Sequence, residues 1–242
     1  ETRKALEGFE ARLLALLPDE VFARWWPELE DVDLPLGAVL RESGARISHA
    51  VFPLTAIVCL VYLLEDGGST EIAVIGHEGL VGMPLFMGGG STLSRAVVQS
   101  AGRGLRVRAD FLMTEFERQP AVMQLLLRFT QALMTQMSQT AVCNRHHAVV
   151  QQLCRWLLLS LDRLPGNELV MTQELIANML GVRREGVTEA AGRLSREGLI
   201  EYRRGRITLF DRPALERRAC ECYGVVRREY DRLLSRTLPL RR

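Results

Sequence analysis

Three charged residues, Arg183, Arg184 and Glu185, stand at the start of a run with helical apolar spacing. A guanidinium group donates two parallel hydrogen bonds to a pair of acceptors, and a carboxylate accepts from an amino group. Such a set of donors and acceptors is suited to forming specific hydrogen bonds with polar groups on a partner molecule. The opposite, apolar face of the same helix is expected to comprise Val187, Ala190, Ala191 and Leu194.

The segment that must position these charges has the spacing of a helix-turn-helix. Two helices that cross closely need a small residue at the contact, which is Ala177. The turn needs a residue that tolerates positive φ, which is Gly181, and the second helix needs a compact apolar residue, which is Val187. An ordinary helical hairpin has the same spacing. However, a helix precedes this pair and the basic hairpin "GLIEYRRGRITLF" follows it, which favours a winged helix-turn-helix.

This arrangement predicts contacts with duplex DNA. In the major groove, Arg184 can bond guanine O6 and N7, and Glu185 can accept from cytosine N4. The arginines of the hairpin, which turns near Arg204, suit phosphates. A surface ion pair and a solvated charged turn are the alternatives. The candidate DNA-binding residues are Thr172, Gln173, Arg183, Arg184, Glu185, Thr188, Glu189, Arg196, Arg203, Arg204 and Arg206.

Charge is divided unevenly along the 242 residues. Residues 1–144 carry 12 basic and 17 acidic side chains, a net charge of −5, and residues 145–242 carry 19 and 12, a net charge of +7. This asymmetry suggests that only the last part meets a polyanion. No apolar run is long enough for a membrane span, and the start "ETRKALEGFEARLL" has no signal-peptide core. The five cysteines show no disulfide-framework or CxxC spacing, so a cytoplasmic location is expected.

The first part of the chain is typical of short strands joined by glycine-rich turns, since 13 of the 20 glycines precede residue 105. Strands are expected in "HAVFPLTAIVCLVYLL", in "EDGGSTEIAVI" with a hairpin turn at Asp66-Gly67, and in "SRAVVQSAGRGLRVR". A short helix is expected around Leu13 to Arg24. The pattern predicts a small antiparallel barrel or jelly roll.

A long helix is expected next, because residues 121–143 contain no Gly and no Pro, and Pro120 suits a first helical turn. Its apolar stripe packs either on its own barrel or on the same helix of a second subunit. We favour the second, because a seam over three heptads is a usual pairing signal. The candidate dimer interface comprises Val122, Leu126, Phe129, Leu133 and Met137.

The predicted fold is therefore α+β with three parts. Residues 1–119 form an antiparallel β-roll with an N-terminal helix, residues 120–145 a dimerisation helix and hinge, and residues 146–242 a winged helix-turn-helix. The last helix is expected from about Pro213 to Ser235.

Two motifs carry a resemblance to the Crp/Fnr family of bacterial transcription regulators. "TQELIANMLGVRREGVTEAAGRLSREGLI" is similar to the family's DNA-binding pattern, and "DGGSTEIAVIGHEGLVG" is similar to its β-roll pattern. The resemblance implies that the roll senses a signal, that the long helix dimerises, and that the dimer binds palindromic double-stranded DNA near promoters, with RNA polymerase as a partner. Glu189 replaces an arginine often found on the recognition helix, so a different DNA site is expected.

The sensor departs from the cyclic-AMP-binding members of that family. Their loop reads Gly-Glu and later Arg-Ser-Ala, where the Glu bonds the ribose and the Arg the phosphate. Here Met83 cannot accept a ribose hydroxyl, and Arg95 is displaced by one place, which turns it to the opposite face of a strand. Cyclic AMP is not expected as the ligand. The candidate effector pocket comprises Gly82, Met83, Ser94, Arg95 and Ser138.

No metal or other cofactor is expected from the remaining residues. An iron-sulfur cluster would need cysteines near the N-terminus, and the first here is Cys59. A haem or metal needs converging ligands, but adjacent His146 and His147 on a helix diverge by about 100°. Cys220 and Cys222, two places apart on a helix, are also expected to diverge.

Two other classes of function compete with the DNA-binding regulator. An enzyme built on a small barrel would need clustered His and Glu on its strands, and the first part offers only His49 and His77, so no enzyme is expected. The alternative is a ligand-binding regulatory module that acts through a protein partner. The salt dependence of binding to duplex DNA separates it from a DNA-binding regulator.

Overall fold

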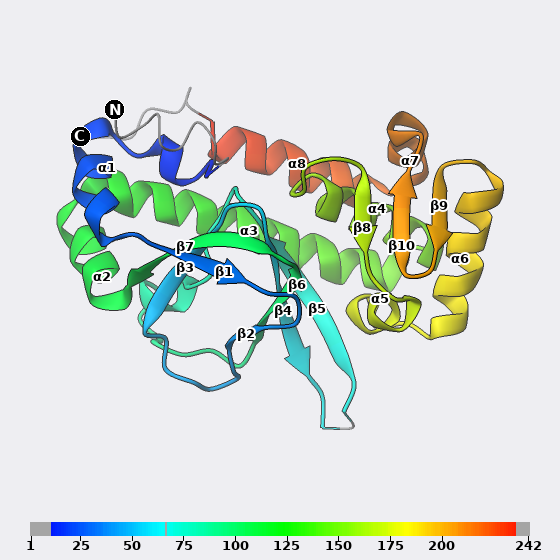
Figure 1. The fold of residues 1–242 in the computed structure, drawn as a ribbon, viewed down its shortest axis with the longest axis horizontal. Helices are drawn as coiled ribbons and strands as arrows, with labels where there is room; N and C mark the ends of the chain where they lie inside the picture. The colour runs from blue at the N-terminus through cyan, green and yellow to red at the C-terminus, as the bar shows by residue number, and fades with distance from the viewer. Residues whose placement is uncertain (1–10, 66, 236–242) are drawn as a thin grey trace.

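The computed structural model describes residues 11–65 and 67–235. A β-roll lies against one side of a long helix, and a smaller domain of helices and a three-stranded sheet lies beyond the helix's C-terminal end (Figure 1). The α+β class expected from the sequence is confirmed. No helix among the described residues combines the length and apolar character needed to cross a membrane.

The roll consists of two antiparallel sheets. Their strand orders are β1-β7-β3 and β2-β6-β4-β5. Strand β4 lies inside its sheet, between β6 and β5, and α3 packs against the sheet at β5. Five successive residues of β4 are therefore buried. The long apolar run expected as strand is interrupted after Pro53. Of the expected hairpin turn, Asp66 lies outside the described residues, and Gly67 has φ +86°. The strands are β1 (Glu30–Leu34), β2 (Val39–Arg41), β3 (His49–Pro53), β4 (Ile57–Leu63), β5 (Ser69–Ile75), β6 (Arg95–Ser100) and β7 (Gly102–Arg108).

Short helices close one end of the roll. Trp25 is buried, and its indole Nε1 donates to Glu115 Oε2 at 3.0 Å, which joins the first helix to a helix after the roll. That second helix, α2, was not predicted from the sequence. The helices of this part are η2 (Leu14–Leu16), α1 (Asp19–Trp25), η3 (Trp26–Glu28), η4 (Met83–Leu85) and α2 (Ala109–Arg118).

The long helix α3 (Pro120–His146) packs its predicted stripe on its own roll. Val122, Leu126, Phe129 and Leu133 are at most 2% exposed in the isolated chain, and Met137 is half-buried. Phe129 packs on Gly79, where an added Cβ would lie 2.4 Å from the ring. The expectation that this stripe forms the dimer interface was wrong, because the stripe is already covered within one chain.

The C-terminal part holds a helix, a helix pair and a sheet of order β8-β10-β9. β8 was not predicted. The expected last helix is broken at Ala219-Cys220, where the backbone is extended, and its second piece runs back along α3 (Figure 1). The elements are α4 (Val149–Leu161), β8 (Glu168–Val170), α5 (Gln173–Leu180), α6 (Arg184–Arg196), β9 (Ile200–Arg203), β10 (Arg206–Leu209), α7 (Arg212–Arg218) and α8 (Glu221–Leu233).

Candidate nucleic-acid interface and effector cavity

The turn between α5 and α6 is built from local signals. Thr172 caps α5, and its hydroxyl accepts from the backbone N–H of Leu175 at 3.3 Å. Gly181 ends α5 in the left-handed region with φ +65°, and α6 begins three residues later at Arg184. Ala177 and Val187 are both buried at the contact between the helices. The residues therefore fold as a helix-turn-helix.

Helix α6 separates its charged and apolar faces as its sequence predicts. Val187, Ala190, Ala191 and Leu194 are buried. The side chain of Arg184 is 64% exposed, and its Nε lies 4.0 Å from Glu174. Such an exposed, loosely paired guanidinium is available to another acceptor at little cost. The other predicted residues at the surface of α6 are exposed too, namely Arg183, Glu185, Thr188, Glu189 and Arg196.

Two polar residues are brought together at the N-terminal ends of the helix pair. Thr188 Oγ1 lies 2.7 Å from Gln173 Oε1 and 3.0 Å from the carbonyl oxygen of Arg184. The contact joins the first turn of α5 to the first turns of α6. It holds Gln173 beside Arg184, on the exposed end of the helix pair.

The hairpin of β9 and β10, the wing, carries its basic residues on a tight turn. Arg204 and Gly205 have φ +52° and +76°, the pattern of a two-residue type I′ turn. Arg203 and Arg204 are exposed. Arg206 differs, since its Nη1 donates to Glu168 Oε2 at 2.5 Å. The carboxylate of Glu168, on the unpredicted strand β8, would therefore compete with a phosphate for Arg206.

A cavity of about 130 Å³ lies between the roll and α3. Three predicted residues line it, namely Gly82, Met83 and Ser94. Arg95 does not, because its Nη2 donates to Glu42 at 2.8 Å on the outside of the roll. Ser138 is exposed and is not among the cavity residues, to which α3 contributes Leu133 and Met137 instead. Of the five residues predicted for the effector pocket, three therefore line this cavity, and Arg95 and Ser138 do not.

The cation of this cavity is Arg41 of β2, which the sequence analysis missed. Arg41 is 8% exposed, and its Nη2 donates to Ser94 Oγ at 3.2 Å. Its Nε is buried without a hydrogen-bond partner, and no carboxylate among the described residues forms an ion pair with it. Burial lowers the pKa of Arg41. A buried guanidinium with spare donors is suited to binding an anion.

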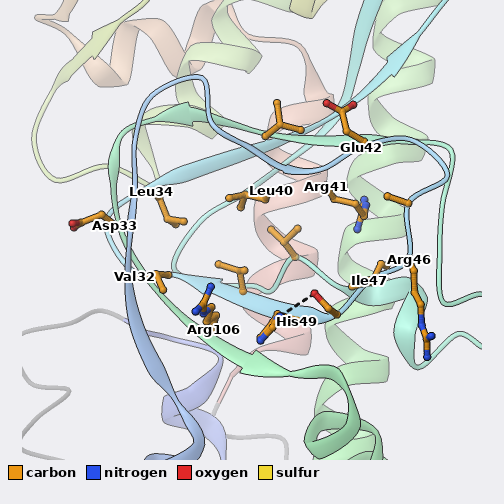
Figure 2. Close-up of a pocket in the computed structure, with 15 residues that line it drawn as sticks. Val32, Asp33, Leu34, Leu40, Arg41, Glu42, Arg46, Ile47, His49 and Arg106 are labelled. Atoms are coloured by element: carbon orange, nitrogen blue, oxygen red, sulfur yellow. Dashed lines mark hydrogen bonds between the residues drawn. The ribbon is translucent and has the colours of Figure 1, made fainter.

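Arg41 also borders a second cavity of about 410 Å³, between the first sheet of the roll and the segment that joins β2 to β3. Figure 2 shows Arg41 on its wall, with Glu42 above it, Arg46 to its right, and His49 and Arg106 to its lower left. The ring nitrogen Nδ1 of His49 lies 3.0 Å from the Ser48 hydroxyl. Arg41 therefore lies between the two cavities, where it can interact with an anion in either.

Buried polar contacts join the roll to the C-terminal domain. The indole Nε1 of Trp156 in α4 donates to Glu71 Oε1 in β5 at 3.1 Å, and Arg163 Nε donates to Glu78 Oε1 at 2.7 Å. Burial raises the pKa of Glu71 to about 8, so its carboxyl is largely protonated at neutral pH. These contacts connect β5 and the loop after it to α4 and the turn that follows α4.

The structure corrects the expectation that the cysteines of the last helix diverge. Cys220 is the N-cap of α8 with ψ 166°, whereas Cys222 lies inside the helix, so the non-helical backbone of Cys220 turns its side chain back toward Cys222. Both meet Cys143 and His147 at the end of α3. His146, by contrast, is exposed and outside this group.

Comparison with known proteins agrees with the geometry. Residues 151–218 match the Crp-like helix-turn-helix domain family. A search of curated proteins finds no match to the chain. Among solved structures, FixK2 from Bradyrhizobium japonicum is similar with a TM-score of 0.68 and 17% identity, over 79% of this chain and 98% of that one.

Two further structures show the same likeness. The c-di-GMP-responsive regulator CLP of Xanthomonas campestris has a TM-score of 0.64 and 15% identity, over 80% of this chain and 100% of its own. A CRP/FNR-family regulator of Thermus thermophilus has a TM-score of 0.62 and 22% identity, over 78% and 98%. The chain therefore shares its fold with these regulators, and its residues 151–218 match the Crp-like helix-turn-helix domain family.

Proposed function

We propose that the chain is a homodimeric, sequence-specific DNA-binding transcription regulator whose roll takes up an anionic effector other than cyclic AMP. The observation that carries the DNA-binding part is the exposed N-terminal end of α6. Arg184 and Glu185 lie there between the Gly181 turn and the wing arginines, on a helix whose other face is buried. In one major groove, Arg184 and Glu185 would bind base edges, and the wing arginines would bind phosphates.

A dimer follows from a second stripe on α3. A second line of apolar residues on α3 is exposed, namely Met123 (37%), Leu127 (44%) and Met134 (56%). Together with Ala141, these residues follow one another at spacings of four, seven and seven positions. This line has the heptad spacing of a helix-helix seam and lies beside the buried stripe. If this stripe packs on the same stripe of a second chain, apolar side chains that are otherwise in contact with water become buried. A two-fold dimer of this kind would read a palindrome, at a promoter where RNA polymerase is the expected partner.

The effector class follows from Arg41 and the size of its cavity. Ligand pockets for drug-sized molecules usually enclose about 300–1,000 Å³. The cavity that Arg41 shares with Met83 and Ser94, between the roll and α3, is only about 130 Å³, whereas the cavity of about 410 Å³ that Arg41 also borders includes neither Met83 nor Ser94. A cyclic nucleotide does not fit there without rearrangement, and Met83 offers its ribose no acceptor. A small anion, held by Arg41 and the Ser94 hydroxyl, is the better match.

Selection of DNA from a random duplex library tests the function. The expected product is a palindrome whose half-sites are centred about 10 base pairs, or a multiple, apart. Fluorescence anisotropy should then show affinity falling steeply as salt concentration rises. Failure to select any sequence, together with no salt-dependent affinity for DNA, would favour the module that acts through a protein partner.

A further inference from the structure

Four side chains with metal-ligating atoms meet where α3 ends and α8 begins. Cys143 lies in the last turn of α3, His147 is its C-cap, Cys220 is the N-cap of α8, and Cys222 is its second residue. Their ligand atoms all lie within 4.8 Å of one another. The Sγ atoms of Cys143 and Cys220 are 3.5 Å apart, and Cys222 Sγ is 3.6 Å from His147 Nδ1.

The separations of 3.5 Å and 3.6 Å are close to those between ligand atoms of a tetrahedral zinc site. Zn–S bonds of about 2.3 Å at tetrahedral angles place neighbouring ligand atoms about 3.8 Å apart. An iron-sulfur cluster, which sets several metal and sulfide atoms between its ligands, would hold the thiolates further apart. Three Cys and one His make a closed set with no open position, which is typical of a structural zinc ion.

The surroundings orient the histidine as metal sites require. His147 Nε2 lies 3.3 Å from the carboxylate of Glu221, the residue between the two cysteines of α8. A proton on Nε2, shared with Glu221, leaves the Nδ1 lone pair directed at the sulfur atoms. Carboxylate, imidazole and metal in this order form the usual outer support of a histidine ligand.

Burial and charge also fit a metal ion. Cys143, Cys220 and Cys222 are at most 5% exposed and form a cluster separate from the main hydrophobic core. One Zn²⁺ with three thiolates carries a net charge of −1. The buried cation Arg155 interacts electrostatically with Cys143 and Cys222 and offsets that charge. Its Nη1 donates to Thr140 Oγ1 at 3.1 Å, which holds it beside the site.

We propose that Cys143, His147, Cys220 and Cys222 bind one Zn²⁺ ion, which clamps the start of α8 to the end of α3. Only His147 and Ala148 separate α3 from α4, the first helix of the DNA-binding domain. The clamp therefore also fixes the direction in which the chain enters that domain. All four ligands lie outside residues 151–218, the range that matches the Crp-like domain family, so that match includes none of the site.

Metal analysis of the full-length protein tests the site. Protein purified under reducing conditions with added Zn²⁺ and then freed of excess metal should hold one zinc per chain. Cys222→Ser should lose this stoichiometric zinc. Cys59→Ser, which removes a buried thiol of β4 that is not among the four ligands, should keep it. Replacement by Co²⁺ should give the intense d–d absorption of a tetrahedral thiolate site.

A second variant protects the test against misfolding. Glu221 has an exposed side chain, so Glu221→Gln should leave the fold unchanged and weaken zinc affinity about 10–100-fold, which competition with a chelator measures. In the wild-type protein, three thiols should become reactive to a thiol reagent only after the chelator is added.

Three results would overturn the proposal. The first is wild-type protein that holds less than a tenth of an equivalent of zinc and shows no Co²⁺ spectrum. The second is bound iron in place of zinc. The third is a Cys143–Cys220 disulfide in protein that was kept reduced. Each is independent of DNA binding, so the zinc site can fail while the proposed regulator stands, and the reverse.

Discussion

At the scale of single residues, position decides what each arginine can do. Arg184 lies at the first position of α6 and is exposed, whereas Arg204 lies on the wing turn with positive φ. A group at the recognition helix reaches base edges, and a group on the wing reaches phosphates. Arg41 is the opposite case, a guanidinium buried with spare donors inside the roll.

Arg184→Ala is expected to weaken binding to the selected palindrome by about 1–3 kcal/mol and to relax the preference at one base pair in each half-site. The reason is the loss of a bidentate contact to guanine. Fluorescence anisotropy on the palindrome and on single-base variants measures both effects. Arg204→Ala, the matched control on the wing, should weaken binding to all duplexes alike. Unchanged binding by Arg184→Ala would show that α6 does not read the bases.

Arg41→Met is expected to leave the apo protein as stable as the wild type or more stable, because it removes a buried cation without a carboxylate partner. It should abolish stabilisation by an anion in the cavity. Thermal unfolding in inorganic phosphate measures this, with about 1.4–2.7 kcal/mol expected for wild type at 10–100 times Kd. Arg95→Met, at a residue turned outward to Glu42, should keep the stabilisation. Equal phosphate effects in wild type and Arg41→Met would refute the anion site.

At the scale of elements, the two faces of α3 have different tasks. The stripe through Phe129 closes the roll, with the ring seated over Gly79. The stripe through Leu127 and Met134 faces solvent in the single chain. Substitutions on the two faces should therefore act on different properties of the protein.

The double variant Leu127→Glu, Met134→Glu is expected to be monomeric and to lose affinity for the palindrome, because like charges would face each other across the seam. Light scattering measures the mass, and thermal unfolding of the dilute protein should show that the chain still folds. A dimer that persists in the double variant would rule out this seam.

Phe129→Ala is the matched change on the buried face and should act on stability instead. Removal of a fully buried ring that packs on the roll should cost about 3–5 kcal/mol in the free energy of unfolding. Denaturant titration measures this value. A cost below about 1 kcal/mol would mean that the ring is not packed against the roll in solution.

At the scale of the whole molecule, the β-roll and the C-terminal domain meet through buried polar groups. Glu71 accepts from Trp156, and Glu78 pairs with Arg163, so signals at the roll wall have a direct physical route to α4. Thr70 is equally close to the helix-turn-helix, since an added Cβ on Gly181 would lie 3.1 Å from its hydroxyl. The protonation of Glu71 should therefore affect how the two domains pack.

Stability is expected to fall as pH rises from about 4.5 to about 8. The pKa of Glu71 is raised by burial to about 8 in the folded chain, so in this window the folded state holds a proton that the unfolded state has lost. The contribution is complete below pH 4.5 and is gone above about 8. Glu71→Gln should remove this slope, measured by denaturant unfolding at several pH values. Glu117→Gln, an exposed carboxylate of α2, should retain it, and an unchanged slope in Glu71→Gln would contradict the assignment.

Elements whose signals are local could be predicted from the sequence. The glycine turn and helix faces of residues 172–196, the hairpin turn near Arg204-Gly205 and the short strands of the first part follow from spacing within a few residues, because turn chemistry and side-chain periodicity act over that range. The register of Arg95 was also predictable, because alternate residues of a strand face opposite ways.

Tertiary structure alone decided which distant residues meet. Arg41 reaches Ser94 across 53 positions, and Cys143 reaches Cys220 across 77. Periodicity showed that α3 has an apolar stripe but not whether the roll or a second chain covers it, because both surfaces reward burial equally. The break before α8 had no helix-breaking residue to reveal it, so the convergence of Cys220 and Cys222 depends on the packing of α8 along α3.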